Sequence, residues 1–361
     1  MNLLKPLCLG LLTLWSFSLF SQEITFEWAH AFGGPQSDPP SDVGVDSEGN
    51  LYFVGGFSGT ADFDPSINNY NLTAAGSLDI FIAKYSSEGT LLWAKSLGSG
   101  GSDTADNIII GSNDEIYISG TFDGMVDFDP NGGVSALSSN GWQDCFLMRI
   151  SSEGDLLWAR SFGASELDLV QGLHLDQNGN VLIAGYFNGE VNFNPNAAPI
   201  IYNAVGDNDV FVCKYDANGN LLWAKQLSGS GSAFAKGITC DSNNNIYFAG
   251  YFTLEMDCDP NSGEQIINSN GLNDAYMIKL NENGEFVWSK SFGAWSEDRI
   301  FAIEIATNDR LYVGGYYRGD VDFDPNEGEI LIPSTNGSDD YFIQQFDLDG
   351  NLIWAQGFGG S

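Results

Sequence analysis

The most regular pattern of hydrophobic and polar positions in the chain is a short run in which the two alternate until a proline ends it. Its clearest copy is Val126-Asp127-Phe128-Asp129-Pro130. The first polar residue of the run recurs every 65 residues, at positions 62, 127, 192, 257 and 322. A fixed period of this length is typical of stacked supersecondary units, so the chain is predicted to be a repeat protein.

A tryptophan next to apolar residues follows the same period. Its six copies are Trp28, Trp93, Trp158, Trp223, Trp288 and Trp354, and only the last step is one residue longer. A recurring aspartate places the extra residue between Pro325 and Asp340. The chain therefore divides into five full units and a partial one, which are residues 28–92, 93–157, 158–222, 223–287, 288–353 and 354–361.

Each unit is predicted to contain four main strands. In the unit 93–157 they fall at residues 91–97, 107–110, 115–122 and 144–150, where apolar and β-branched residues lie between polar or Gly-rich turns. Gly120 lies inside the third of these runs and recurs in every unit, which indicates a bulge or a close approach of neighbouring backbone. No stretch shows sustained helical periodicity.

Four antiparallel strands per repeat, without helices, predict an all-β fold: a β-propeller in which each repeat forms one four-stranded blade. A closed ring would be five-bladed. Because both a Trp28 strand and a Trp354 strand exist, one of them could close the ring by tying the termini together. The alternative is an array that has been cut short.

A second set of repeated residues carries a family resemblance. The segment Phe32-Gly33-Gly34, followed by Asp38, Asp46 and Gly49-Asn50-Leu51-Tyr52, resembles the bacterial SBBP β-propeller repeat. The match recurs in every unit, with departures at Gly111, Ala233 and Ala306. The resemblance implies a secreted or surface propeller. It implies no activity, because the family is defined by its repeat.

The first 21 residues are predicted to be a secretory signal peptide, which leaves residues 22–361 as the β-propeller repeat domain. Lys5 supplies the positive charge, and residues 7–20 form an apolar run that is too short for a membrane anchor. No second apolar run of spanning length follows. We therefore expect no membrane insertion and a location outside the cell or on its surface.

The charge balance narrows the choice of partners. Acidic side chains outnumber basic ones by 48 to 13, and the formal net charge of −35 argues against nucleic acid and anionic membranes. Divalent cations, glycans, proteins and a larger surface assembly stay open as partners. A charge that serves solubility alone is the alternative.

The four cysteines beyond the signal segment are predicted to be buried free thiols. Cys258 stands where the other units have phenylalanine, and Cys240 stands where they have valine, isoleucine or leucine. A cysteine that replaces an apolar residue behaves as a small hydrophobic side chain. The other two are Cys145 and Cys213.

Candidate ligand residues gather in two links of each unit. In a propeller, alternate connections emerge on opposite faces. The link after the Trp strand and the link that carries the alternating Asp run should therefore share one face and present an acidic ring around the channel. Candidates there are Asp38, Asp103, Asp168 and Asp298, together with Trp142 and Trp295, which fall in loops, break the repeat and could stack on a sugar.

The alternating Asp run itself has two interpretations. In the favoured one it is a strand end: Val126 and Phe128 face one side, the two aspartates face the other, and Pro130 ends the strand. The alternative is a calcium site, because residues 127–132 match the first half of a calcium loop although Ser138 stands where its closing Glu would be. The candidate metal ligands are Asp62, Asp64, Asp127, Asp129, Asp257, Asp259, Asp322 and Asp324.

Three other repeated positions are interpreted as structural. The aspartate before the last strand of each unit is predicted to cap a loop through backbone N–H groups. The repeated tryptophan is predicted to pack between blades. A repeated basic position is expected on solvated strand edges, where charge opposes edge-to-edge pairing; its residues are Lys84, Arg149, Lys214 and Lys279.

The predicted function is a non-catalytic binding or display scaffold for a glycan or a protein, with no cofactor unless calcium binds. One alternative is an enzyme that acts on polysaccharides, a glycoside hydrolase or lyase, through two channel carboxylates. A catalytic pair needs two different environments, and repetition makes most of these acids equivalent, apart from Glu166, Glu297 and Glu304. The other alternative is a purely structural array of a larger surface protein.

Overall fold

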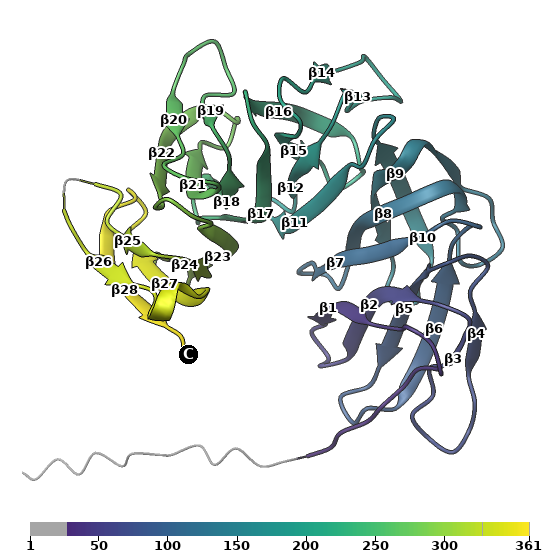
Figure 1. The fold of residues 1–361 in the computed structure, drawn as a ribbon. Helices are drawn as coiled ribbons and strands as arrows, with labels where there is room; N and C mark the ends of the chain where they lie inside the picture. Colours follow the sequence, from purple (N-terminus) through teal and green to yellow (C-terminus); the bar gives the residue numbers. More distant parts are fainter. Residues whose placement is uncertain (1–26, 327, 361) are drawn as a thin grey trace, which may run out of the picture.

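The computed structural model describes residues 27–326 and 328–360, and in this range it consists of five successive antiparallel sheets arranged along an arc (Figure 1). The first sheet has the strand order β1-β2-β5-β6. Its strands are β1 (Pro40–Val45), β2 (Leu51–Phe57), β5 (Asp79–Tyr85) and β6 (Leu91–Leu97). The prediction of an all-β chain built from four antiparallel strands per repeat is confirmed. The predicted signal peptide lies outside the described residues.

The same order of four main strands recurs in the other four sheets, and the strand with the repeated tryptophan is always the fourth of them. Each sheet therefore takes its fourth strand from the start of the next sequence unit. The second sheet contains β7 (Thr104–Ile110), β8 (Ile116–Asp127), β9 (Ala136–Ile150) and β10 (Leu156–Phe162), and the third contains β11 (Leu169–Leu175), β12 (Val181–Phe187), β15 (Asp209–Tyr215) and β16 (Leu221–Gly229). The fourth contains β17 (Ala233–Cys240), β18 (Ile246–Phe252), β21 (Asp274–Leu280) and β22 (Phe286–Phe292), and the fifth contains β23 (Arg299–Ala306), β24 (Arg310–Tyr317), β27 (Asp340–Phe346) and β28 (Leu352–Phe358).

A short hairpin projects from each sheet, and its first strand contains the start of the alternating Asp run. The sequence predicted that strand end but not the return strand. In the second sheet the hairpin continues β8 and β9, with Asp127 opposite Ala136. In the other sheets it is a distinct pair of strands: β3 (Thr60–Asp62) with β4 (Asn71–Thr73), β13 (Glu190–Asn192) with β14 (Ile201–Asn203), β19 (Glu255–Asp257) with β20 (Ile266–Asn268), and β25 (Asp320–Asp322) with β26 (Leu331–Pro333). The pair β19–β20 also extends the third sheet, because β19 pairs with the end of β16.

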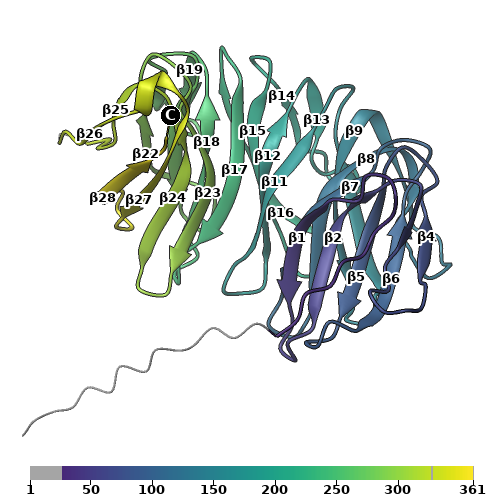
Figure 2. The ribbon, with the colours of Figure 1, turned by 60° about the horizontal axis from the view of Figure 1, so that its bottom comes forward.

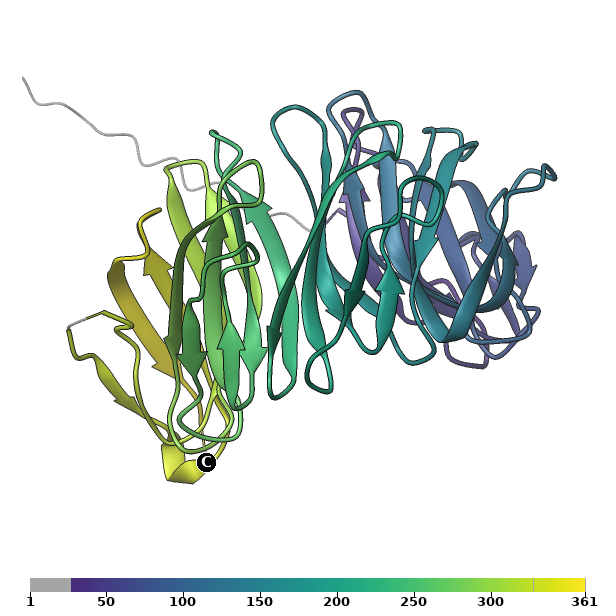
Figure 3. The ribbon, with the colours of Figure 1, turned by 90° about the horizontal axis from the view of Figure 1, so that it is seen from above.

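The sheets stand side by side, with their first strands β1, β7, β11, β17 and β23 along the concave side of the arc (Figures 1 and 2). The main hydrophobic cores lie between sheets rather than within one. Ile80 and Ile82 of the first sheet, for example, pack with Ile108 and Ile118 of the second. Seen from above, the first and last sheets stay apart (Figure 3). A single sheet is too thin to bury both faces, so each relies on its neighbour.

The repeated strand glycine confirms the predicted close approach of neighbouring backbone. A Cβ atom on Gly185 would lie 1.9 Å from the carbonyl oxygen of Leu169. Leu169 precedes a register shift in β11 between Val170 and Gly172, and the inner strand of every sheet has a shift at this place. Only a residue without a side chain fits beside this bulge.

Two further expectations concern cysteine and the membrane. Cys145, Cys213, Cys240 and Cys258 are buried and free, as the repeat predicted. Within residues 27–326 and 328–360 there is no helix with the length and apolar character needed to cross a membrane.

Candidate functional site

An aspartate at the entrance of the inner strand is completely buried in three of the five sheets. These residues are Asp103, Asp168 and Asp298. The carboxylate of Asp168 accepts a 2.6 Å hydrogen bond from the backbone N–H of Ala164 and a 3.2 Å bond from that of Asn188. It thereby ties the link before β11 to the link after β12, which are the two links that the sequence assigned to one face.

Burial raises the pKa of these carboxyl groups. The pKa of Asp168 rises to about 7, because the group is removed from water and lies near Asp144 and Glu166, while its two backbone hydrogen bonds act in the opposite direction. Burial likewise raises the pKa of Asp298 to about 6 and that of Asp103 above its ordinary value. These three side chains are therefore internal loop caps and do not form the exposed acidic ring that the sequence predicted.

The other ligand candidates of this face have more contact with solvent. Asp38 is half-buried and accepts a hydrogen bond from the backbone N–H of Gly34. Trp142 and Trp295 are exposed. Trp295 lies in the link between β22 and β23, as expected, whereas Trp142 lies at an irregular part of β9 rather than in a loop. They come from different sheets, so each is a separate aromatic surface.

The alternating Asp run is held by backbone hydrogen bonds in every sheet. Oδ1 of Asp127 accepts the N–H of Asp129 at 3.1 Å and that of Ser135 at 2.8 Å. The side-chain oxygen of Asn192 makes the equivalent pair of bonds at 3.1 Å each. An uncharged amide thus accepts the same two backbone hydrogen bonds as the carboxylate, which supports the strand-end interpretation. Asp62, Asp257 and Asp322 repeat the arrangement.

The second acidic position of the run also caps a turn. Asp64, Asp129, Asp259 and Asp324 each accept the backbone N–H of the residue two positions later. In the described part of the chain, no group of three or more His, Cys, Asp or Glu side chains is arranged to hold a metal ion. The eight candidate calcium ligands are therefore engaged in the turns of their own hairpins.

The repeated aspartate that the sequence places before the last strand of each unit caps the preceding loop, as predicted. Asp144 accepts the N–H of Asn140, four residues earlier. Asp340 accepts that of Thr335, five residues earlier. The extra residue of the last unit is therefore absorbed in this loop, where a short 3₁₀ turn spans Thr335–Gly337.

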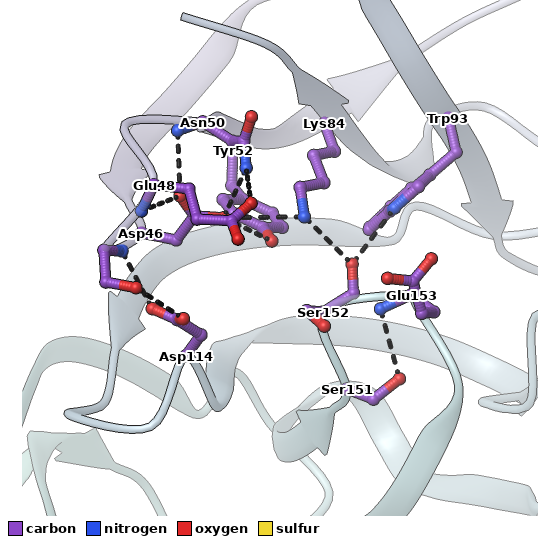
Figure 4. Close-up of polar contacts among 11 residues, drawn as sticks. Asp46, Glu48, Asn50, Tyr52, Lys84, Trp93, Asp114, Ser151, Ser152 and Glu153 are labelled. Atoms are coloured by element: carbon purple, nitrogen blue, oxygen red, sulfur yellow. Dashed lines mark hydrogen bonds and ion pairs between the residues drawn. The ribbon is translucent and has the colours of Figure 1, made fainter.

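At the opposite end of the first, second and fourth sheets, a basic residue and the repeated tryptophan bind a turn of the next sheet. Figure 4 shows the first of these contacts. Nζ of Lys84 and Nε1 of Trp93 both donate to the carbonyl oxygen of Ser152, at 3.4 and 3.2 Å. Lys84 also lies 3.5 Å from Asp46, whose carboxylate organises the turn of its own sheet. This corrects one expectation: Lys84, Lys214 and Lys279 are buried between sheets rather than solvated at an edge.

The concave side carries an aromatic cluster that the sequence analysis did not identify. It consists of Tyr186, Tyr251 and Tyr316 on the second strands of three sheets, and of Phe234 and Phe301 on the adjoining inner strands. The Phe234 ring lies 4.8 Å from the rings of both Tyr186 and Tyr251. Phe301 is exposed, and Tyr186, Phe234 and Tyr316 are half-buried. We refer to these five residues as the inner aromatic cluster.

Two basic side chains lie over this cluster, although basic residues are scarce in the chain. The guanidinium of Arg299 is 4.5 Å from the ring centre of Tyr251, and Nζ of Lys236 is 5.7 Å from it. Burial and the nearby Arg299 lower the pKa of Lys236. Arg299 also pairs with Glu297 at 3.2 Å, and Lys236 donates to Gln171 at 2.6 Å.

The inner aromatic cluster departs from the repeat, and this was the signal available in the sequence. The position of Tyr186, Tyr251 and Tyr316 is occupied by Gly56 and Thr121 in the first two sheets. The position of Lys236 varies in every sheet. Positions that a repeat leaves free to vary, yet which line one surface, are the ones a ligand site would use.

The repeated sheets and their repeated turns define an all-β protein built from propeller-type repeats. The family SBBP, described as a beta-propeller repeat, matches residues 222–251, which run from β16 through β17 into β18. The resemblance predicted from the sequence is therefore confirmed in this segment.

Two curated relatives are similar over larger parts of the chain. An uncharacterized WD repeat-containing protein of Acanthamoeba polyphaga mimivirus is 23% identical in an alignment of 329 residues that covers 76% of this chain and 24% of that protein. The regulatory protein FlaEY of Caulobacter vibrioides is 26% identical over 158 residues, or 43% of this chain and 16% of that protein. The chain thus spans about a quarter or less of the length of these relatives.

Similarity to solved structures is low. A protein of unknown function from Bacteroides caccae covers 79% of this chain and is itself covered to 92%, with 11% identity and a TM-score of 0.34. The extracellular domain of a putative one-component system from B. thetaiotaomicron covers 92% of this chain and is covered to 73%, with 11% identity and a TM-score of 0.16.

Proposed function

We propose that this protein is a secreted or surface-exposed, non-catalytic β-propeller scaffold that binds a glycan on the concave side of its arc. Each four-stranded sheet is one blade, and the chain supplies five. The observation that carries the proposal is the inner aromatic cluster, where three tyrosines and two phenylalanines from neighbouring sheets meet beneath Arg299 and Lys236. Aromatic faces stack on sugar rings, and the two cations suit an acidic substituent.

The burial of the repeated acids supports a non-catalytic role. Asp168 and Asp298 have raised pKa values, which is a common property of general acids, but their carboxylates are buried and occupied by backbone N–H groups. A catalytic acid must reach the bond that it protonates. A polysaccharide-cleaving activity that disappears on mutation of either aspartate would contradict this part of the proposal.

The glycan proposal is tested by binding to a glycan array, followed by titration of the best ligand. The variants Phe301→Ala and Tyr316→Ala should each weaken binding by about tenfold or more, as expected for central aromatic contacts. Leu222→Ala is the matched control, because Leu222 is an exposed apolar residue on the outer strand β16. Glycans with carboxylate groups should bind more tightly than neutral ones, and Arg299→Ala should remove this preference.

Two results would overturn the site. If glycan binding persists in both cluster variants but is lost in Trp142→Ala or Trp295→Ala, the binding site is at those exposed indoles and not at the inner aromatic cluster. If no glycan binds, but a protein ligand does and the cluster variants abolish its binding, then the inner aromatic cluster is the binding site and its ligand is a protein.

A further inference from the structure

The two ends of the arc expose the two halves of a contact that the chain makes internally four times. Between the first two sheets, Ile80, Ile82 and Leu97 form one core with Ile108 on the inner strand of the next sheet. The same repeat positions form the cores of the three following contacts. One face of each sheet is thus shaped to receive the inner strand and opposite face of another sheet of this chain.

No part of residues 27–326 and 328–360 covers the receiving face of the last sheet. Tyr341, Ile343 and Phe358 are 59%, 41% and 49% exposed, whereas Ile80, Ile82 and Leu97 at the same positions of the first sheet are 0%, 0% and 4% exposed. A hollow of about 320 Å³ adjoins them, lined by Ala302, Ile303, Glu304, Tyr312, Val313, Gly314 and Ile343. We call Tyr312, Tyr341, Ile343 and Phe358 the uncovered face.

The first sheet presents the complementary half. Val43 and Val45 on β1 are 49% and 55% exposed. Their counterparts Ile108 and Cys240 on later inner strands are 7% and 6% exposed, because a preceding sheet covers them. We call Val43 and Val45 the uncovered edge. Apolar side chains are exposed to water at both ends of the arc, so burying them against a partner surface is favourable.

We propose that the uncovered face of one molecule binds the uncovered edge of a second copy, in the same manner as the internal contacts. The four internal contacts show which chemistry covers such a face: the inner strand of another sheet of this sequence. Within the described residues the first and last sheets lie apart across the open side of the arc (Figures 1 and 2), so they do not cover each other, and a second copy carries the matching surface. The contact joins unlike surfaces and therefore continues into a ring or a filament.

Residues 27–33 lie against the first sheet, where they would compete with the proposed contact. Nε1 of Trp28 donates to the carbonyl oxygen of Ser87 at 2.9 Å, and the Phe32 ring stacks on Phe63 and Tyr85 at 5.6 Å. The segment thus occupies the place that the fourth strand of a preceding sheet takes elsewhere, since Trp93 makes the same bond to Ser152. In the proposed assembly, β28 of the molecule that contributes the uncovered face takes this place, so residues 27–33 of the other molecule compete with it.

The proposal is tested by sedimentation velocity on the chain without its signal segment over a range of protein concentrations. We expect the degree of association to rise with protein concentration. Tyr341→Asp and Val43→Asp should each weaken this association by about tenfold or more. Both residues are exposed, so the variants should keep the wild-type circular dichroism spectrum. Val134→Asp is the control, because Val134 is exposed and belongs to neither surface. A chain that begins at Gly34 should associate more tightly.

A mixing experiment then defines the geometry. The Tyr341→Asp chain keeps its edge and the Val43→Asp chain keeps its face, so an equal mixture should form dimers and nothing larger. Full association of the Val43→Asp chain alone would overturn the proposal in favour of a contact between two last sheets. A wild-type chain that is monomeric at every concentration would overturn it entirely. Neither variant touches the inner aromatic cluster, so glycan binding should persist and the two proposals can fail separately.

Discussion

At the scale of single residues, the repeated strand glycine gives the sharpest test of the packing. Gly185→Ala places a methyl group 1.9 Å from the Leu169 carbonyl oxygen, so the bulge must move and the free energy of unfolding should fall by about 1–3 kcal/mol. The matched control is Gly100→Ala, because a Cβ there meets nothing within 4 Å. Urea unfolding measures both. Equal stability of the two variants would contradict the close approach.

A second residue-scale prediction concerns the pH dependence of stability. The pKa of Asp168 is about 7 in the folded protein, against an ordinary value of 3.8. Between these values the folded state holds a proton that the unfolded chain has released, so this group makes stability fall as pH rises from about 4 to about 7. Asp168→Asn cannot ionise and should therefore gain stability relative to the wild type across that window. A difference that is constant with pH would contradict burial as the cause.

The residues also show how far a sequence can be interpreted at this scale. The loop-capping role of the aspartate series and the packing role of the strand glycine followed from position in the repeat. The burial of Asp168 and Lys214 did not, because a charged side chain is ordinarily exposed. Both are buried because tertiary structure supplies backbone partners. Asp168 accepts hydrogen bonds from the links before β11 and after β12, and Lys214 reaches the carbonyl oxygen of Glu282 in the next sheet.

At the scale of the element, variants of the projecting hairpin can distinguish whether its aspartate forms a turn or binds a metal. Asp127→Asn keeps the acceptor oxygen, as Asn192 does naturally, and should leave the melting temperature nearly unchanged. Asp127→Ala removes both hydrogen bonds, the one from Asp129 in the turn and the one from Ser135 next to the return strand, and should lower the stability by about 1 kcal/mol. Differential scanning calorimetry with and without calcium completes the test. A clear rise in melting temperature with calcium, lost in Asp127→Asn, would restore the metal interpretation.

The hairpin also shows what the alternation of polar and apolar residues predicts. It correctly placed Val126 and Phe128 on the buried side, where both are fully buried. The return strand was missed because its three residues carry too short a pattern. Its position depends on a hydrogen bond accepted by one aspartate eight residues earlier in the chain, which also caps the turn between the two strands. Such an element is specified by its hydrogen bonds and hardly at all by periodicity.

At the scale of the whole molecule, the arrangement of sheets makes equivalent residues unequal. Ile82 and Ile343 are the same residue at the same repeat position, but their exposed fractions are 0% and 41%. Ile82→Ala should therefore cost about 2–5 kcal/mol, as for a buried isoleucine, and Ile343→Ala much less. Unfolding at low protein concentration measures the pair. Equal losses would mean that the last sheet is covered in solution by its own chain.

The sequence by itself determined the 65-residue period, the all-β class, the four main strands of each unit and the turns that join them. It could do so because each depends on residues close together in the chain, and five copies make every local pattern visible. The tertiary structure alone decided which surfaces are covered. It placed Asp103, Asp168 and Asp298 inside, gathered the inner aromatic cluster from three sheets and left one face of the last sheet open. These surfaces depend on which sheets lie next to each other. Every repeat carries the same contact residues, whether or not a neighbouring sheet packs against them.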